Sequence, residues 1–382
     1  MNRSPGEPIT YDYGSELFPS ELPTKMSMWR YARLLPLEPG RIAYPLPVGG
    51  TPLLAVGPLR RGMAMPRLHL KDETIGPSSS NKDRATALVI ENGLRHGAKA
   101  ITTASTGNAA LSTCIGAAAA GMLAIIFVPF GCDLRKVALM AGTGAAVFEV
   151  ARGYDAAVEL SLAASREFGL VDRNTGINPL TVEAKKTVAF EIWEQLGRRA
   201  PDVVVIPVGD GTTLAGIAKG FRELIACGVV ERSPRLIGVQ AAACQPLVCA
   251  WEGRRPGAAE LNAKGTSAAG IAVEVPSLGE QALADVKASG GAFLAVPEAA
   301  IASGRRSLAS AGILAEEASA ACQAGLMAAL ECGLVDRNEL TVLLVTGRGL
   351  GVVPHHTKTQ RLIVDGGGLV EVAAVIDRLL GS

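Results

Sequence analysis

The sequence predicts an α/β protein whose parallel β-sheets are covered by helices on both faces. Short apolar runs alternate with amphipathic helical patterns along almost all of the chain after residue 50. The apolar runs, such as residues 203–206, lack the polar–apolar alternation of a strand with one face in water. Strands of that kind belong to parallel sheets with two buried faces. With 382 residues, the chain is long enough to form two such lobes.

The expected elements follow one another in a regular order. Residues 1–50 form an irregular arm with one short amphipathic piece at 28–35. In the first block, strands at 68–70, 99–103, 123–128 and 145–150 alternate with helices at 82–97, 109–120, from 133 onward, and at 154–168. In the second block, strands at 203–208, 236–240, 293–296 and 340–345 are accompanied by helices at 181–196 and 214–226 and by two more before the last strand. The polar stretch 172–178 is a candidate crossing point between the blocks, and two such blocks imply two lobes. We expect one large domain (1–85 and 173–382) and one small domain (86–172).

Composition and charge exclude several classes of protein. Hydrophobic residues make up 48% and charged residues 19%, which excludes a disordered chain. A net charge of +1 provides no electrostatic basis for binding nucleic acid or an anionic membrane. The most apolar window, 115–130, is interrupted by Gly121 and Pro129 and is too short to span a bilayer. The seven cysteines form no C-x-x-C pair, so we expect neither a metal site nor disulfides, and a cytoplasmic location.

One lysine has a position that suits chemistry. Lys82 lies in the stretch 77–84, which follows a predicted strand and leads into a helix. Ser80 and Asp83 resemble a capping box, which places Lys82 in the first helical turn. The free N–H groups and the positive dipole end there disfavour an ammonium and favour the neutral amine, the form that attacks a carbonyl. Taken alone, an ordinary solvated lysine is the more common interpretation.

Three turns at predicted strand ends add binding groups, because ligands of parallel α/β sheets gather at the carboxyl ends of the strands. The turn Ser105, Thr106, Gly107 and Asn108 combines hydroxyls with helix-start N–H groups, which suits a carboxylate, although an ordinary N-cap fits it equally well. The turn Gly209, Asp210, Gly211, Thr212 and Thr213 lets the backbone close around a phosphate. The turn around Thr346 ends the last strand, and without the other two turns we would interpret it as an ordinary turn at the end of a strand.

An amine, a phosphate turn and a carboxylate turn together describe what pyridoxal phosphate requires of a protein when the substrate is an amino acid. No paired carboxylates, Ser/His/Asp set or metal-ligand cluster competes with this interpretation. A nicotinamide dehydrogenase is a weaker alternative, because Leu214 stands where a dinucleotide fingerprint needs its third glycine.

The same segments resemble the threonine synthase branch of the fold-type II pyridoxal-phosphate enzymes over most of the chain after residue 28. The segments that carry the resemblance are Gly50-Thr51-Pro52-Leu53, Ser80-Asn81-Lys82-Asp83-Arg84, Ala104-Ser105-Thr106-Gly107-Asn108, Pro207-Val208-Gly209-Asp210-Gly211-Thr212-Thr213, Glu316-Glu317-Ala318-Ser319-Ala320 and Leu344-Val345-Thr346-Gly347-Arg348-Gly349-Leu350. The resemblance implies a two-lobed enzyme, each lobe a parallel-rich sheet flanked by helices, in which the large domain binds the cofactor. It also implies a homodimer.

The resemblance further implies a role for each candidate residue. Lys82 corresponds to the Schiff-base lysine, and 209–213 correspond to the turn that holds the cofactor phosphate. Residues 105–108 would contact the substrate carboxylate, with Asn108 on the cofactor's ring oxygen, and Thr346 would face the pyridine nitrogen. A hydroxyl there favours elimination or replacement of a side-chain group over transamination, so we expect a carbon–oxygen lyase with the Lys82 amine as base.

Three departures from the family pattern limit how far the resemblance extends, and the third concerns the substrate. Asn81 replaces a Phe, and Asp210 replaces a neutral Asn, so the Asp210 carboxylate should point away from the phosphate or accept backbone N–H groups. Thr181 stands in the substrate region where threonine synthases are expected to carry an Arg. Losing that guanidinium makes phosphohomoserine a doubtful substrate. The alternatives are true threonine synthesis with a rearranged site, a serine/threonine dehydratase, and a non-catalytic relative that binds an amino acid.

Overall fold

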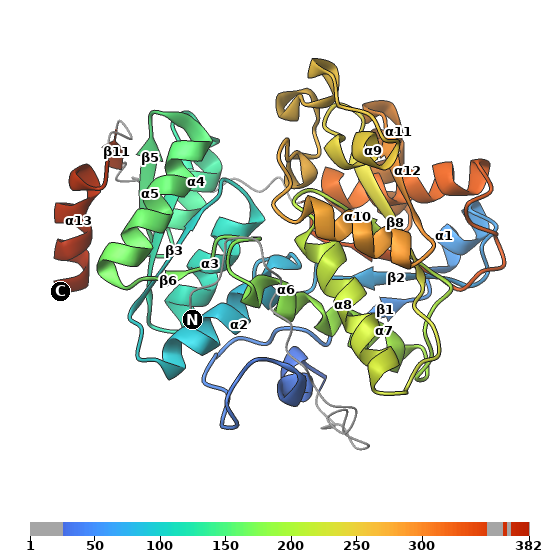
Figure 1. Cartoon of the computed structure of the whole chain (residues 1–382), viewed down its shortest axis with the longest axis horizontal. Coiled ribbons are helices and arrows are strands. Elements are labelled where there is room, and N and C mark those ends of the chain that lie inside the picture. The colour runs from blue at the N-terminus through green and yellow to red at the C-terminus, as the bar shows by residue number, and fades with distance from the viewer. Residues whose placement is uncertain (1–25, 350–361, 365–367, 382) are drawn as a thin grey trace. The chain divides into compact units, whose positions relative to one another are not determined.

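The computed structural model describes residues 26–349, 362–364 and 368–381, and the chain divides into two compact units (Figure 1). Within the described residues, unit 1 comprises 26–36, 49–81 and 182–349. Unit 2 comprises 37–48, 82–181, 362–364 and 368–381. Each unit is built around one sheet of mainly parallel strands, as the sequence predicts.

The sheet of unit 1 has the strand order β1-β2-β10-β7-β8-β9, and only β1 runs antiparallel to its neighbour. Its strands are β1 (Leu53–Leu54), β2 (Leu68–Asp72), β7 (Val203–Pro207), β8 (Arg235–Ala241), β9 (Ala292–Val296) and β10 (Thr341–Val345). Its helices are η2 (Met28–Leu34), α1 (Gly57–Gly62), α7 (Thr187–Gln195), α8 (Thr212–Ala226), α9 (Pro246–Trp251), η3 (Ala258–Glu260), η4 (Ala263–Gly265), η5 (Ala269–Ile271), α10 (Gly279–Ala288), α11 (Glu298–Ser310) and α12 (Glu317–Glu331).

Both faces of this sheet are buried, which explains its uninterrupted apolar strands. Val203 and Val205 of β7 pack into the core formed with α1, α11 and α12. Val204 and Ile206 of the same strand pack into the opposite core, formed with α7, α8 and α10. Successive side chains of a strand point to opposite faces of the sheet, and both faces are buried here. Each such strand therefore needs an apolar residue at every position.

The sheet of unit 2 has the order β11-β5-β4-β3-β6, and all its pairs are parallel. Its strands are β3 (Ala100–Ala104), β4 (Leu123–Pro129), β5 (Ala146–Val150), β6 (Val171–Asp172) and β11 (Leu362–Val364). Its helices are α2 (Lys82–Arg95), α3 (Asn108–Ala119), α4 (Leu134–Ala141), α5 (Gly153–Phe168) and α13 (Val370–Gly381). Helix α6 (Leu180–Lys185) crosses the division between the units.

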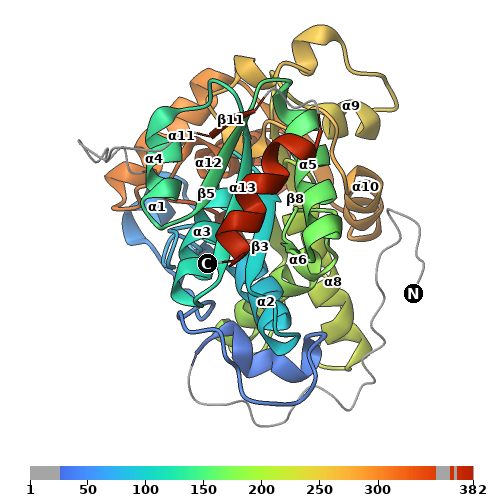
Figure 2. The same cartoon turned by 90° about the vertical axis from the view of Figure 1, so that its left-hand side faces the viewer.

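The observed division differs from the sequence-based one, which assigned 173–382 and everything before residue 86 to the large domain. Strand β11 pairs with β5, and Val372 and Ile376 of α13 pack in one core with α5 (Figure 2). The segment 37–48 also belongs to unit 2, since the Ala43 and Tyr44 N–H groups each donate to Glu91 Oε2 at 2.8 Å. These long-range pairings have no counterpart in local sequence patterns.

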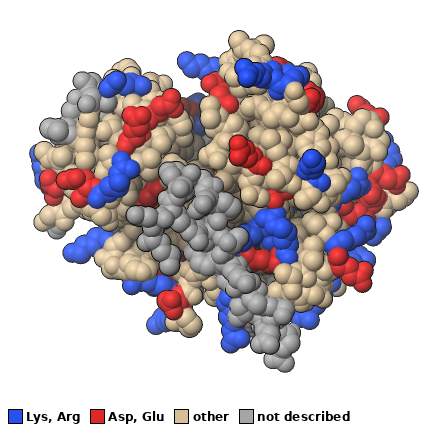
Figure 3. Space-filling model, in the orientation of Figure 1, with Lys and Arg blue, Asp and Glu red and all other residues tan. Residues whose placement is uncertain are grey.

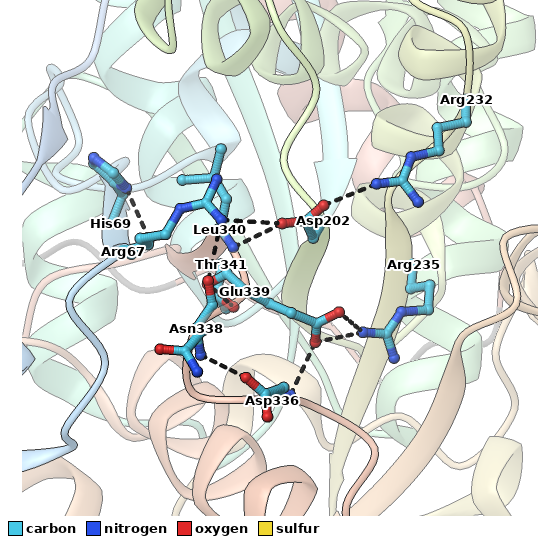
Figure 4. Close-up of polar contacts among 10 residues, drawn as sticks. All are labelled: Arg67, His69, Asp202, Arg232, Arg235, Asp336, Asn338, Glu339, Leu340 and Thr341. Carbon is cyan, nitrogen blue, oxygen red and sulfur yellow. Dashed lines mark hydrogen bonds and ion pairs between the residues drawn. The ribbon is translucent and has the colours of Figure 1, made fainter.

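Charged side chains gather at the amino ends of the unit 1 strands (Figure 4). Asp202, just before β7, accepts the Leu340 N–H at 2.9 Å and also pairs with Arg232 at 2.9 Å. Arg235, the first residue of β8, donates to both oxygens of Glu339 at 2.6 Å. This network links the starts of β7, β8 and β10. The opposite edge, where these strands end, carries the turns singled out in the sequence.

Within the described residues, no helix combines the length and apolar character needed to cross a bilayer. On the face drawn in Figure 3, Lys and Arg side chains are intermixed with Asp and Glu.

Candidate active site

The turn after β7 brings backbone N–H groups to the start of α8. Gly211 precedes the helix with φ +89°, and a Cβ there would lie 2.7 Å from the Leu278 carbonyl oxygen. A Cβ on Gly209 would lie 3.0 Å from Ile271 Cα. Gly211 is therefore required, a side chain at residue 209 would be tightly packed, and the turn can close over the first N–H groups of a 15-residue helix. We call residues 209–213 the phosphate turn.

Three polar side chains complete the phosphate turn. Thr212 is fully buried, and its Oγ1 has no hydrogen-bond partner in the described structure. Thr213 Oγ1 accepts from Lys185 Nζ at 2.9 Å and lies 3.3 Å from Asn81 Nδ2. Asp210 Oδ1 accepts the Thr212 N–H at 3.0 Å, one of the two arrangements expected from the sequence. The turn thus combines two threonine hydroxyls with the ammonium of Lys185, and the Asp210 carboxylate is bonded to a backbone N–H of the same turn.

The segment before Lys82 is fastened to the turn that ends β10. Ser79 has the left-handed φ of +57°, and its carbonyl accepts the Arg348 N–H at 3.0 Å. Ser80 forms a bridge with Gly347, and the Asn81 N–H donates to the Thr346 carbonyl at 2.8 Å. Helix α2 begins at Lys82 itself, so this lysine lies in the first turn as the sequence predicts.

Ser319 holds the Thr346 turn from beneath. Its Oγ accepts the N–H groups of Thr346 and Gly347 at 3.0 Å and 2.9 Å. The same oxygen lies 3.1 Å from Thr346 Oγ1 and 3.1 Å from the Gly347 carbonyl oxygen. Strand β10 lies between β2 and β7 in the sheet, so the Thr346 turn and the phosphate turn follow neighbouring strands of one edge.

In unit 2, the turn 105–108 follows β3 and starts α3. The Ser105 N–H donates to the Phe127 carbonyl, and the Gly107 N–H lies 3.2 Å from Ser105 Oγ. Residues 105–108 are partly exposed, and Asn108 is the first residue of α3. The arrangement leaves the start of a 12-residue helix accessible to an anion.

Thr181 is used by its own turn. It is fully buried, and its Oγ1 donates to the Asn178 carbonyl at 2.6 Å and lies 3.4 Å from the Gly176 nitrogen. The Thr181 hydroxyl thus holds together the loop before α6.

Sequence reasoning missed Arg173. This buried arginine donates from Nε to Thr86 Oγ1 at 3.1 Å and from Nη2 to the Lys82 carbonyl at 3.4 Å, and Nη1 contacts Thr175 Oγ1. It therefore braces the first turn of α2, the turn that carries Lys82. The only sequence signal was a charged residue inside the polar stretch 172–178.

A hollow elsewhere in unit 1 is not this site. It has a volume of about 610 Å³ and is lined by α1, β9, α11 and α12, including Met63, Ser307 and Gln323. Neither the phosphate turn nor the Thr346 turn lines it. Among the described residues, no group of three or more His, Cys, Asp or Glu side chains is arranged to hold a metal ion.

Comparison with known proteins agrees with this geometry. The family model described as "Pyridoxal-phosphate dependent enzyme" matches residues 44–347. A threonine synthase of Methanosarcina acetivorans is 32% identical over 97% of this chain and 89% of its own length. One from Methanocaldococcus jannaschii is 33% identical over 85% of this chain and 81% of its own length. The processed form of threonine deaminase isoform 2 from Solanum lycopersicum superposes with a TM-score of 0.68 at 21% identity, covering 92% of this chain and 96% of that one. From the family match and the identity to these synthases, the chain belongs to the pyridoxal-phosphate dependent enzymes and is threonine synthase-like, with the fold-type II architecture.

Proposed function

We propose that the protein eliminates or replaces an oxygen-linked side-chain group of a small amino acid, with Lys82 as the residue attached to pyridoxal phosphate. One observation carries this proposal. Asn81, the residue before Lys82, reaches Thr213 of the phosphate turn with its side chain and Thr346 with its backbone N–H. The peptide next to the lysine is therefore tied to both turns that the cofactor needs.

The phosphate turn fits a phosphate monoester by its own chemistry. Two glycines leave room where any side chain would collide with the backbone. A buried hydroxyl without a partner, such as Thr212 Oγ1, costs roughly 1–3 kcal/mol unless an acceptor arrives. The α8 N–H groups and the Lys185 ammonium add the charge preference for a dianion.

The chain's own residues then divide the work. Bound pyridoxal phosphate supplies an electron sink that makes the substrate Cα–H acidic. The Lys82 amine would hold the cofactor covalently and, as a free amine, would accept the substrate Cα proton at Nζ. The Thr346 hydroxyl, kept in place by Ser319, would be the group offered to the pyridine nitrogen, and it has no negative charge that would keep that nitrogen protonated. The family resemblance assigns the N–H groups at 105–108 to the substrate carboxylate and Asn108 to the cofactor ring oxygen, roles that an accessible helix start would suit.

Two candidate substrates follow. The first is a small amino acid with a neutral or acylated leaving group, as in serine or threonine dehydration. Thr181 supports it, because its hydroxyl bonds to the Asn178 carbonyl of its own turn and offers no charge to a substrate phosphate. Threonine formation from phosphohomoserine is favoured instead by the identity to proteins named threonine synthase.

The attachment is tested with purified protein, Lys82→Ala and borohydride. The wild-type protein with pyridoxal phosphate should show a visible absorbance band that borohydride removes, leaving the cofactor fixed to the peptide containing Lys82. Lys82→Ala should lack both the band and the adduct. A band of full intensity in the variant would refute the assignment. Serine, threonine, phosphoserine, O-acetylserine and phosphohomoserine are then assayed in parallel for keto acid, phosphate and new amino acid.

We further propose that unit 1 is the cofactor-binding domain, that unit 2 is the substrate-side domain, and that the protein is a cytoplasmic homodimer. The position of the phosphate turn supports the first assignment, and the family resemblance supports the dimer. The cysteines of the described residues are all free, which agrees with a reducing compartment. Light scattering over a range of protein concentrations tests the dimer.

A further inference from the structure

We propose that Lys185 is the charge-balancing residue of the cofactor-phosphate site, where it offsets the Asp210 carboxylate and directs the Thr213 hydroxyl proton to the phosphate. The inference rests on the proposed function in one respect only, that the phosphate turn receives the cofactor phosphate. Neither the sequence interpretation nor the comparisons assign a role to Lys185.

The hydrogen-bond direction at Thr213 carries the first step. A lysine ammonium can only donate, so Thr213 Oγ1 accepts from Lys185 Nζ at 2.9 Å. Asn81 Nδ2 lies 3.3 Å from the same oxygen and donates to its second lone pair. With both lone pairs engaged, the hydroxyl proton of Thr213 is available to an acceptor such as a phosphate oxygen. Polarisation by a cation strengthens that donor.

The charges at the turn carry the second step. Asp210 places a carboxylate within the phosphate turn, and its Oδ1 removes the Thr212 N–H from those available to an anion. A phosphate dianion added beside that carboxylate would be repelled in a partly buried site. Lys185 is fully buried, and its contact with Thr213 directs its positive charge to the same turn. The Lys185 ammonium therefore brings to this turn a positive charge that offsets the charge of the Asp210 carboxylate.

The packing of Lys185 against α8 favours its contact with the phosphate turn. A Cβ on Gly216 of α8 would lie 2.7 Å from Lys185 Cβ, so α6 and α8 approach closely only because residue 216 is glycine. The next residue, Lys186, is equally buried but pairs with Glu183 at 2.7 Å and Glu223 at 3.0 Å. Two adjacent buried lysines thus serve different partners, and the one directed to the phosphate turn is Lys185.

The test compares cofactor forms with and without the phosphate. Apoprotein is titrated with pyridoxal phosphate and with pyridoxal, and each Kd is read from the visible absorbance. Lys185→Met should weaken pyridoxal phosphate binding about 10- to 100-fold, the loss typical of one charged hydrogen bond, and leave pyridoxal within about twofold. Lys185→Gln, which can still donate to Thr213 but has no charge, should lie between Lys185→Met and the wild type. Asp210→Asn should tighten pyridoxal phosphate binding and restore part of the loss in Lys185→Met.

Lys219→Met is the matched control, since it removes the same charge from a lysine that pairs with Glu183 and Glu223 instead of the phosphate turn. It should not change the ratio of the two Kd values. If wild-type protein binds both forms equally, the phosphate turn itself is misassigned and the proposed function fails. If wild-type protein prefers pyridoxal phosphate and both Lys185 variants keep that preference, the role of Lys185 is refuted while the proposed function stands. Circular dichroism shows whether each variant folds. If Lys185→Met does not fold, the two Kd values of Lys185→Gln decide the role of Lys185.

Discussion

Replacing Ser319 with alanine tests whether one buried hydroxyl keeps the Thr346 turn in shape. Ser319 lies in the first turn of α12 and is fully buried. Its oxygen is the acceptor for two backbone N–H groups, those of Thr346 and Gly347. Alanine removes this acceptor and changes the side-chain volume little, so the effect comes almost entirely from hydrogen bonding.

The expected size follows from these contacts. Each buried N–H left without an acceptor costs about 1–3 kcal/mol, and partial entry of water or backbone adjustment lowers the total. We therefore expect Ser319→Ala to reduce the free energy of unfolding by about 2–4 kcal/mol. For a domain of 150–250 residues each kcal/mol lowers Tm by about 2–4 °C, so the shift should be easily measured. The Thr346 hydroxyl also loses its partner, and we expect the visible absorbance of the bound cofactor to shift.

Thermal unfolding followed by circular dichroism, with and without pyridoxal phosphate, measures the effect. Ser310→Ala is the control, because Ser310 Oγ donates to the Ser307 carbonyl at an exposed helix end. It should change stability by less than about 0.5 kcal/mol. A Ser319→Ala protein as stable as the Ser310→Ala protein would show that the two N–H groups find other acceptors, and the assigned role of Ser319 would be wrong.

Two further predictions concern unit 1. Gly325→Ala should destabilise the protein by about 1–3 kcal/mol, because the new Cβ would lie 2.3 Å from Val239 Cγ2; urea unfolding measures this loss, and Val239→Ala in the same chain should recover part of it. His69 should lower the stability of the folded protein in acid. Burial, and after it the Arg60 charge, lowers the pKa of His69 below 6.5. Arg60 Nη2 donates to His69 Nε2 at 3.0 Å, and His69 Nδ1 donates to the Arg67 carbonyl at 3.2 Å. The folded state then binds fewer protons than the unfolded state, so the free energy of unfolding falls as pH drops through 6.5, and His69→Gln should weaken that dependence; an unchanged pH profile would contradict the assignment.

The longer strands, such as β7, were predictable because they are buried on both faces, whereas the short strands β6 and β11 were not predicted. Residues 203–206 are apolar at every position, and the structure places Val203 and Val204 in different cores. The sequence likewise predicted the position of the turn 209–213, since Gly209 and Gly211 lie between a strand and a helix, and the structure has β7 before this turn and α8 after it. Local patterns of this kind depend only on neighbours along the chain.

The contacts that define the site depend on distant residues, and these were not predictable. Lys185 and Lys186 look alike in the sequence, yet one contacts Thr213 and the other contacts Glu223, which lie 28 and 37 positions away in the chain. Asn81 was read as a departure from the family pattern, whereas the structure uses its amide against Thr213. The partners of the two lysines depend on how the segment joining α6 and α7 lies against α8, and the partner of Asn81 depends on how the segment before α2 lies against the start of α8. No spacing rule along the chain describes either arrangement.

Arg173 bears on the substrate. A buried guanidinium in unit 2 could in principle replace the Arg missing at Thr181 and hold a substrate phosphate. Its nitrogens, however, donate to Thr86, Thr175 and the Lys82 carbonyl, which are acceptors of the chain itself. A phosphate held by two parallel N–H groups would compete with these bonds, which brace the first turn of α2. The observed contacts of Arg173 therefore give it a role in supporting the turn that carries Lys82, and they do not assign it to a substrate phosphate.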